Sequence, residues 1–303
     1  MARFWPSSTP SVHCLLFFLT LLSGLAVTQT KKVDRPLYLF VHIPRTGGVS
    51  FGSAIEDLVG KEAVCHMRHL SSTNEPWPNI LARLVNDAAM QTEFEEALSK
   101  CDVLWDHFDY GIAKMLKRIT SRNVRVMTQL RPPVDRFLSS HFKQFRRAGP
   151  EIAVAELERR IGEMESGAVS PIKHMLVGYL SGCAIPFDPA MHQESCGDFD
   201  AMYAAARESV DTTPYLGLSS DPAAALRKFF RESDFAAKLP VKALTDLSEK
   251  ARAQERWYTD QVTDEIRTRL SAIFELDEKL YRAAEARLSV SSSPLSAFAA
   301  GEL

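Results

Sequence analysis

The stretch from Leu37 to Phe51 constrains the fold of this 303-residue chain more than any other. Its first half is an unbroken run of apolar, strand-forming residues, which is typical of a strand buried on both faces of a sheet. A turn rich in proline and glycine follows, and Ser50 is expected to cap an amphipathic helix from Phe51 to Val59. The stretch therefore predicts a strand, a tight turn and a helix in direct succession.

A strand, a glycine turn and a helix in this order form a geometry that binds phosphate groups. Gly47 and Gly48 allow the backbone to come close to an anion, on which several N–H groups and the helix N-terminus converge. Arg45 adds a fixed cation, and Thr46 and Ser50 add hydroxyl groups. A tight turn that holds no ligand is the alternative interpretation of this turn taken alone.

A second unit of the same kind lies further along the chain. Val124 to Leu130 is predicted to form a strand that leads through Arg131 into a helix from Val134 to Arg147. Ser139 follows Arg131 by eight residues, which places its hydroxyl within reach of the same anion, although a surface serine also fits this position. Two such units with polar turns predict an α/β fold, an open parallel sheet flanked by helices with a ligand across its C-terminal edge.

The remaining pattern completes one domain from 36 to 288 with a mostly helical C-terminal half. Further short strands are expected at Asp102–Trp105 and Tyr215–Leu218, and a loop over residues 61–80. Residues 289–303 are rich in Ser and Ala without periodicity and are expected to form a disordered tail. Helices are expected at Leu81–Leu98, Ile112–Thr120, Glu151–Ile161, Ile172–Leu180, Phe199–Val210, Pro222–Phe230 and Leu247–Leu288.

The net charge and the N-terminus limit the possible partners and the compartment. A net charge of −2 gives no overall field for nucleic acid, so an anionic ligand must be held by local clusters of charge. Residues 1–30 form a targeting segment, because the apolar stretch from Val12 to Val27 is typical of a signal-peptide core. A cleaved signal and a retained anchor are both open, and contact with a membrane is expected only through this segment.

The cysteines fit an oxidising lumen. Cys14 lies in the targeting segment, which leaves an even number of cysteines in the domain. Cys183 and Cys196 bracket a short loop with two prolines and are predicted to pair, so that Cys65 and Cys101 pair by elimination. No metal site is predicted, because neither a Cys-x-x-Cys pair nor clustered histidines occur.

The two turns together resemble the motifs of a known family. The segment His42–Ser50 resembles the 5′-phosphosulfate loop of the Golgi carbohydrate sulfotransferases, which include heparan sulfate 2-O- and 6-O-sulfotransferases. The segment Leu130–Ser139 resembles their 3′-phosphate motif, and weaker similarity continues at Tyr215–Leu218 and Leu276–Tyr281. The resemblance implies a P-loop-like α/β sheet and 3′-phosphoadenosine 5′-phosphosulfate (PAPS) as the donor. A nucleotide kinase is disfavoured, because the Walker pattern G-x-x-x-x-G-K-[ST] is absent.

The resemblance also implies roles for single residues. Arg131 and Ser139 would hold the 3′-phosphate of the donor. Two positions depart from the family: Arg45 stands where lysine is usual, and Pro132 where aspartate is usual. The 5′-phosphosulfate would be held by the residues of the first turn, which are Arg45, Thr46, Gly47, Gly48, Val49 and Ser50.

Transfer of a sulfuryl group to an alcohol needs a base near the attacking hydroxyl, and histidine suits that task. His107 lies in a polar turn directly after a predicted strand and resembles the position of the family's catalytic histidine, so we predict His107 and Arg45 as catalytic residues. A histidine that is merely hydrogen-bonded in a loop is the alternative. Other candidates for the base are His42, His66, His69, Asp106 and Asp109.

The predicted function is a luminal glycan O-sulfotransferase, either anchored in the Golgi membrane by its N-terminus or cleaved and secreted. An anionic polysaccharide is the expected acceptor and would contact a run of basic residues, although a solvated basic face also explains that run. A protein that binds 3′,5′-ADP (PAP) or an anionic glycan without catalysis is the alternative. The basic residues are Lys143, Arg146, Arg147, Arg159 and Arg160.

Overall fold

A five-stranded parallel sheet organises the part of the chain that the computed structural model describes. That part comprises residues 35–66, 84, 86–167, 174–183, 196–235 and 259–291. The strands lie in the order β2-β3-β1-β4-β5, which confirms the predicted α/β class. Their bounds are β1 Leu37–Val41, β2 Val64–Cys65, β3 Val103–Asp106, β4 Val124–Leu130 and β5 Tyr215–Leu218.

The apolar run of β1 occupies the centre of the sheet because both of its faces are covered. Every residue of β1 is buried, and the strand pairs with β3 on one side and β4 on the other. Leu39 and Val41 contribute to the hydrophobic core on one face, and Tyr38 and Phe40 to the core on the opposite face. This is the pattern expected of a central parallel strand.

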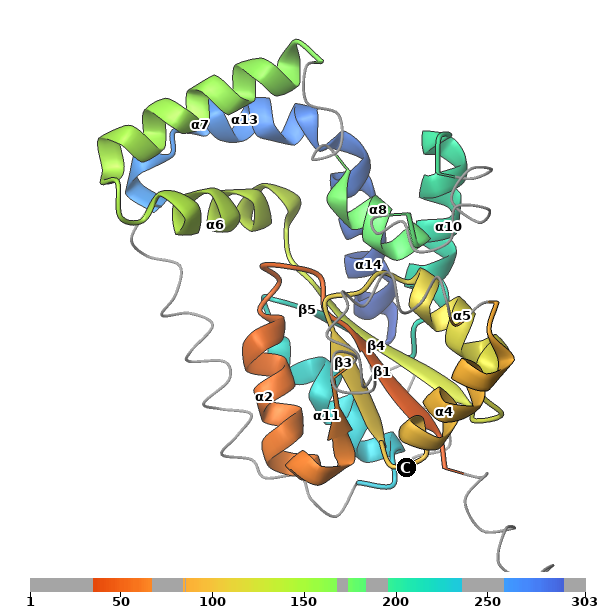
Figure 1. Ribbon diagram of the computed structural model, residues 1–303. Coiled ribbons are helices and arrows are strands. Elements are labelled where there is room, and N and C mark those ends of the chain that lie inside the picture. Colours follow the sequence, from red (N-terminus) through yellow and green to blue (C-terminus); the bar gives the residue numbers. More distant parts are fainter. Residues whose placement is uncertain are drawn as a thin grey trace, which may run out of the picture. The chain divides into compact units, whose positions relative to one another are not determined.

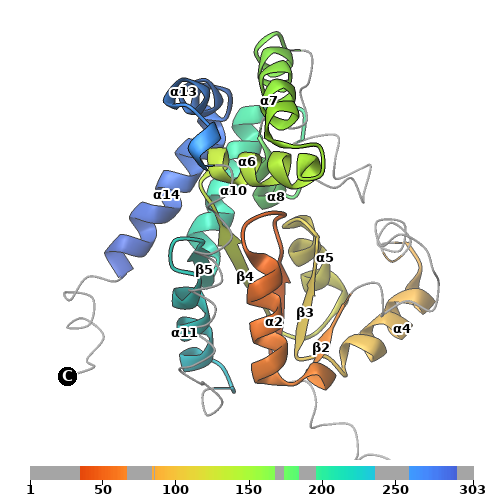
Figure 2. The same ribbon diagram turned by 90° about the vertical axis from the view of Figure 1, so that its left-hand side faces the viewer.

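Helices cover both faces of the sheet (Figure 1). On one face lie α2 (Gly48–Val59) and α11 (Pro222–Glu232), whose apolar residues pack on Tyr38 and Phe40. Figure 2 faces this side of the sheet and shows α2 and α11 next to each other. The helices of the other face are α4 (Ala88–Leu98), α5 (Gly111–Ile119), α8 (Met175–Ser181), α10 (Phe199–Thr212) and α14 (Glu275–Ser291).

Three further helices pack on one another beyond the carboxyl edge of the sheet (Figure 1). They are α6 (Pro133–Phe145), α7 (Pro150–Glu165) and α13 (Asp264–Ile273), and they share a separate hydrophobic core. Short 3₁₀ helices occur at Lys61–Ala63 and Thr259–Gln261. Because α6 follows β4 directly, this helix connects the edge of the sheet to the core that α6, α7 and α13 share.

The predicted continuous helix from Leu247 to Leu288 is wrong in the part that the structure describes. Two helices, α13 and α14, occupy it and are separated at Phe274, whose buried ring lies 5.2 Å from that of Phe137. The two helices bury their apolar residues in different cores, α13 against α6 and α7, and α14 against α8 and α10. No proline or glycine marks the break. Helix α14 also continues to Ser291, into the segment predicted as a tail.

Strand β2 was not predicted, because Val64 and Cys65 lie in a segment interpreted as loop. Two residues are too few to give a periodic pattern, and pairing with β3 forms the strand. Residues 67–80 of that predicted loop and the targeting segment 1–30 lie outside the described residues. Among those described, no helix has both the length and the apolar character of a membrane span.

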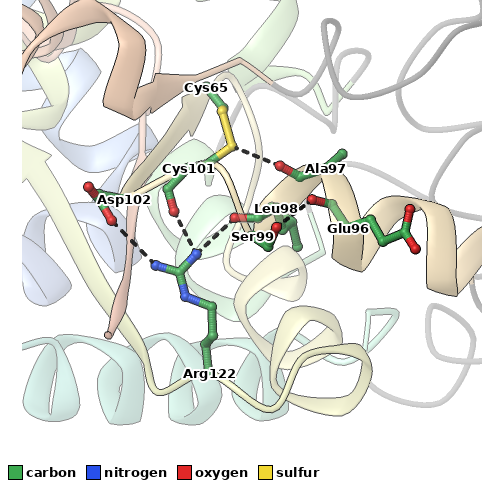
Figure 3. The surroundings of a disulfide bond; sticks show 8 residues. All are labelled: Cys65, Glu96, Ala97, Leu98, Ser99, Cys101, Asp102 and Arg122. Carbon is green, nitrogen blue, oxygen red and sulfur yellow. Dashed lines mark hydrogen bonds and ion pairs between the residues drawn. A yellow bond between two sulfur atoms is a disulfide. The ribbon is translucent and has the colours of Figure 1, made fainter. Parts of the chain in front are cut away.

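Both predicted disulfides are present, Cys65–Cys101 and Cys183–Cys196. Next to the first disulfide, Arg122 connects the amino ends of three strands. Figure 3 shows its contacts with Leu98, Cys101 and Asp102. Its guanidinium donates to Cys101 O at 2.5 Å before β3 and to Pro36 O at 2.8 Å before β1, while Arg122 itself precedes β4. A further bond reaches Leu98 O at the end of α4. The strands β3, β1 and β4 are thus held together at their starts.

Candidate active site

The carboxyl ends of three neighbouring strands bring the predicted site residues together. The turn with Arg45 follows β1, His107 follows β3, and Arg131 follows β4. Helix α2, after β1, covers one face of the sheet, whereas α5, after β3, covers the other. Chains that leave adjacent strands toward opposite faces open a crevice at the sheet edge, where ligands of open α/β sheets bind.

The first turn has the backbone shape of an anion-binding loop. Arg45 and Gly47 both have positive φ, 69° and 90°, which is unusual for arginine. Helix α2 begins at Gly48, so the prediction that Ser50 caps the helix is wrong: Gly47 is the N-cap and Ser50 lies in the first helical turn. No side chain caps this described N-terminus, and uncapped N–H groups of a first helical turn are the groups that bind anions in proteins.

Other residues of the first turn support the loop from inside. Thr46 is buried, and its hydroxyl donates to Ile43 O at 2.8 Å, so that its proton is used within the loop. Gly48 packs on the ring of His42, where an added Cβ would come within 2.0 Å of Cδ2. Val49 is 64% exposed and can contribute only its backbone. Packing against His42 therefore requires a glycine at position 48.

The two predicted motifs are in direct contact. Arg45 Nη2 donates a hydrogen bond of 2.7 Å to Ser139 Oγ, across 94 positions of sequence. Ser139 is only 5% exposed, so it is not the surface serine that the sequence left open. Arg45 thereby joins the loop after β1 to the helix after β4.

The second turn keeps a regular helix start in spite of its two prolines. Arg131 follows β4 directly and is partly buried. Pro132 is the N-cap of α6, and its carbonyl accepts from Arg136 N at 2.9 Å, the first bond of the helix. A proline at this position costs no helical hydrogen bond. The departure from the aspartate of the resembling family is thus compatible with an intact α6.

His107 is exposed and held in one tautomer. Its Nδ1 lies 3.1 Å from His42 O, and because a carbonyl oxygen only accepts, Nδ1 carries the proton. The lone pair then belongs to Nε2, which is the arrangement that a general base needs. The backbone N–H of His107 donates to Asp106 Oδ1 at 2.8 Å, which fixes the turn.

The ring of His42 is neutral near neutral pH. It is 2% exposed, and burial, with a smaller contribution from neighbouring His107, lowers the pKa of His42 to about 3. The two rings stack with centroids 4.1 Å apart. His42 therefore acts as a neutral platform for the ring of His107.

The remaining candidates for the base have other contacts. His66 Nε2 lies 3.2 Å from Glu56 Oε1, which also accepts from Trp105 Nε1 at 3.0 Å. Asp109 is fully buried, and its carboxylate accepts from Gly111 N at 3.0 Å. His69 lies outside the described residues. These contacts favour His107 over His66 and Asp109 as the proton acceptor.

Gln129 is a site residue that the sequence analysis missed. It lies on β4, is 1% exposed, and its Nε2 donates to Leu218 O at 3.5 Å. Its Oε1 lies next to Gly47 and has no hydrogen-bond partner in the described part of the chain. Two successive polar residues, Thr128 and Gln129, at the end of a strand expected to be buried are the signal that could have identified it.

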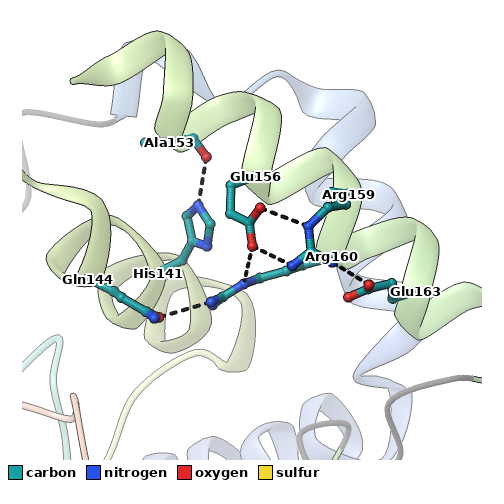
Figure 4. A network of polar contacts seen from close by, with 7 residues as sticks. All are labelled: His141, Gln144, Ala153, Glu156, Arg159, Arg160 and Glu163. Carbon is teal, nitrogen blue, oxygen red and sulfur yellow. Dashed lines mark hydrogen bonds and ion pairs between the residues drawn. The ribbon is translucent and has the colours of Figure 1, made fainter. Parts of the chain in front are cut away.

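The basic residues predicted to face the acceptor fall into two groups. Lys143, Arg146 and Arg147 are exposed. Arg159 and Arg160 on α7 both bind Glu156, and Arg160 Nη2 also donates to Gln144 Oε1 at 3.1 Å (Figure 4). The described residues include no group of three or more His, Cys, Asp or Glu arranged to hold a metal ion.

No model of a known protein family matches the chain. A segment of 115 residues, 38% of this chain, is 29% identical to a protein-tyrosine sulfotransferase of Arabidopsis thaliana. The match spans only about a fifth of that relative, 19% of its length. This partial similarity does not show the family of the chain, and it does not assign the chain to the carbohydrate-specific group that its two motifs resemble.

Proposed function

We propose that this chain is a sulfotransferase that moves a sulfuryl group from PAPS to a hydroxyl group of a glycan in the secretory pathway. The observation that carries the proposal is the hydrogen bond from Arg45 to Ser139, because it joins the two phosphate-type turns at one edge of the sheet. His107 follows the adjacent strand β3 at the same edge. The two turns proposed to bind the donor and the proposed base, His107, thus lie at the same edge of the sheet.

The donor is bound through both of its charged ends. The N–H groups of Gly48, Val49 and Ser50 and the guanidinium of Arg45 hold the 5′-phosphosulfate at the start of α2. Arg131 and Ser139 hold the 3′-phosphate at the second turn. The 3′-phosphate distinguishes PAPS from ATP, so this turn provides the selectivity.

The reaction is an in-line displacement at sulfur. The acceptor oxygen forms a bond to sulfur while the bond from sulfur to the bridging phosphate oxygen breaks, which releases PAP. His107 Nε2 takes the hydroxyl proton, and the His42 carbonyl stabilises the resulting imidazolium through Nδ1–H. Arg45 and the N–H groups of the loop stabilise the charge that develops on the leaving phosphate.

The two disulfides support a compartment of the secretory pathway, because disulfides are typical of an oxidising lumen. We place the enzyme in the Golgi lumen, with residues 1–30 serving as a signal anchor or a cleaved signal. The acceptor is an anionic polysaccharide that contacts the exposed basic residues Lys143, Arg146 and Arg147.

A donor titration tests the proposal. Calorimetry with PAPS, PAP and ATP should give tight binding of the first two and weak binding of ATP. If ATP binds as tightly as PAP, the chain is not a PAPS-dependent sulfotransferase. Binding of PAP without transfer to any acceptor would favour the non-catalytic binding protein.

A tyrosine hydroxyl in a protein is a second candidate acceptor, favoured by the name of the Arabidopsis thaliana relative. Labelled PAPS offered with desulfated glycosaminoglycans and, separately, with tyrosine-containing acidic peptides separates the two. Label in the polysaccharide alone supports the glycan acceptor. Label in the peptide alone would show that the acceptor is tyrosine and not a glycan.

A further inference from the structure

Helix α8 is capped by a residue that lies about a hundred positions away in the sequence. Within the described part of the chain, its own N-cap residue, His174, forms no side-chain cap. The carboxylate of Asp277 on the neighbouring helix α14 takes that place (Figure 1). Its Oδ2 accepts from Leu176 N and its Oδ1 from Val177 N, both at 2.9 Å. A carboxylate at this position satisfies the first N–H groups of a helix and interacts favourably with the helix dipole.

Asp277 also connects α8 to α6. Asp277 is fully buried, and so is Arg136 of α6, which is 2% exposed and whose Nη1 donates to Met175 Sδ at the start of α8 at 2.7 Å. Burial lowers the pKa of Arg136, and the nearby carboxylate of Asp277 opposes this shift. Loss of one of two buried opposite charges leaves the other uncompensated, so these two depend on each other. The first turn of α8 is thereby tied to the helix that carries Ser139.

The opposite end of α8 packs on the start of α5. Tyr179 O of α8 accepts from Tyr110 N at 2.7 Å. Gly182 ends α8 with a φ of 86°, and a Cβ added to it would come within 2.7 Å of Gly111 N. Backbone meets backbone at this contact, so no flexible side chain could move aside to make room.

The start of α5 belongs to the turn that carries His107. This histidine follows β3, and Tyr110, the N-cap of α5, comes three residues later. Between them, Phe108 is fully buried in the hydrophobic core to which Leu176 and Leu180 of α8 also belong. A displacement of α8 would therefore be passed to the turn with His107.

We propose that Asp277 is a positioning residue of the transfer reaction, because through α8 it fixes the turn with His107 relative to α6. This inference rests on the proposed function for the roles of His107 as the base and of Ser139 as a ligand of the donor. In-line transfer needs the base at a fixed place relative to the donor, and a misplacement of about 1 Å can cost about 10²-fold in rate. Helix α6 keeps its packing on α7 and α13 without α8, so the effect falls on turnover and not on donor affinity.

The first experiment pushes α8 away from the turn with His107. Gly182→Ala places a methyl group against Gly111, and turnover with labelled PAPS should fall at least about tenfold. PAP affinity, measured by calorimetry, should stay within about threefold. Gly167→Ala is the matched control, because Gly167 also has a positive φ, 81°, but no described residue lies within 4 Å of an added Cβ. It should alter neither quantity. Equal turnover of the two variants, or a joint loss of turnover and PAP affinity in Gly182→Ala, would overturn the proposal.

The second experiment removes the charge that caps α8. Asp277→Asn keeps the shape of the side chain but loses the charge and one acceptor, and it should show the same combination of lowered turnover and retained PAP affinity. Glu275→Gln removes a charge from an exposed position of the same helix and should change neither. If Asp277→Asn fails to fold, the double variant with Arg136→Met leaves no uncompensated charge and takes its place. Normal turnover in the folded variant would overturn the proposal.

A measurement without donor or acceptor separates this inference from the proposed function. Nitrogen NMR of histidine-labelled protein reports the tautomer of His107, whose Nδ1 donates to His42 O at 3.1 Å. The His107 signals should shift in Gly182→Ala and Asp277→Asn and stay unchanged in the two controls. Unshifted signals would overturn the inference even if the wild type transfers sulfuryl groups. Shifted signals in a protein whose wild type transfers none would support the link through α8 and overturn only the proposed function.

Discussion

The ring of His107 stacks on the ring of His42 with 4.1 Å between centroids, and the backbone carbonyl of His42 accepts from His107 Nδ1. His107 is exposed and His42 is almost fully buried, so the two stacked imidazole rings lie in different environments. The buried ring stays neutral and orients the exposed one, whose Nε2 is left as the basic nitrogen.

We expect His107→Ala to lower turnover about 10²–10⁴-fold, the range for a positioned general base. The substitution changes no residue of the two turns proposed to hold the donor, so PAP affinity should stay within about threefold, less than 1 kcal/mol. Transfer from labelled PAPS measures turnover, and calorimetry measures PAP affinity. His66→Gln, a histidine after the neighbouring strand β2, is the control and should keep near-normal turnover. Joint loss of thermal stability and PAP affinity in His107→Ala would mean a structural role.

Arg45→Ala should weaken PAP binding by about 1.5–3 kcal/mol, the scale of a hydrogen bond to a charged group. Alanine and arginine carry the same backbone cost at a φ of 69°, so the substitution reports on the guanidinium alone. Arg45→Lys keeps the positive charge but lacks the planar guanidinium, so its PAP affinity should lie between those of the wild type and Arg45→Ala. Affinity that is unchanged in both variants, measured by calorimetry, would remove Arg45 from the site.

Gly48→Ala should destabilise the fold by about 1–3 kcal/mol, the range for overpacking, because the new methyl group would overlap the ring of His42. Gly162 on α7 is the matched control, since nothing lies within 4 Å of an added Cβ there. Gly162→Ala should therefore stabilise the fold by about 0.5–1 kcal/mol. Urea unfolding measures both changes, and equal effects at the two positions would contradict the packing explanation.

Acid should weaken the fold through His42. Its pKa is about 3 in the folded chain against 6.5 for an ordinary histidine, so between these values the unfolded chain binds a proton that the folded chain does not. Stability is then lost progressively as the pH falls from about 6.5 toward 3. His42→Phe keeps a ring but cannot titrate. As the pH falls from about 6.5 toward 3, the unfolding free energy of the wild type should therefore decrease more than that of the variant. A difference that does not depend on pH would contradict the lowered pKa.

Removing the disulfides one at a time should give unequal losses. The chain-entropy relation gives about 3–4 kcal/mol for Cys65–Cys101, which spans 36 residues, and somewhat less for Cys183–Cys196, which spans 13. Serine double variants, unfolded in urea without reductant, measure the two. Mass spectrometry of protein made in an oxidising lumen should find both pairs, and free thiols at all four positions would contradict the luminal assignment.

The sequence predicted the elements that have a strong local pattern. The apolar runs of β1 and β4 and the periodic helices α7, α10 and α11 were found within a few residues of their true bounds. Strand β2 and the break at Phe274 were missed because tertiary pairing and packing, with no local signal, produce them. The start of α2 was misplaced because Gly47, which caps the helix without a side chain, was interpreted as part of the turn.

The candidate site was only partly predictable for the same reason. The residues after β1, β3 and β4 could be named from their positions, since the ends of parallel strands share one edge. The contact between Arg45 and Ser139 and the place of Gln129 next to Gly47 depend on residues far apart in sequence. A local sequence pattern cannot predict contacts between residues so far apart in the chain, so these two contacts became visible only in the structure.

The hydrogen bonds of Arg122 have a consequence at the opposite end of the sheet. They gather the starts of β3, β1 and β4, and these are the strands whose ends carry His107, Arg45 and Arg131. A strand that shifted along its neighbour at one end would shift equally at the other, because paired strands move as units. Arg122 thus helps to align, from the far edge of the sheet, the strand ends that carry Arg45, His107 and Arg131. Substitution of Arg122 is therefore expected to disturb the candidate site although Arg122 is not part of it.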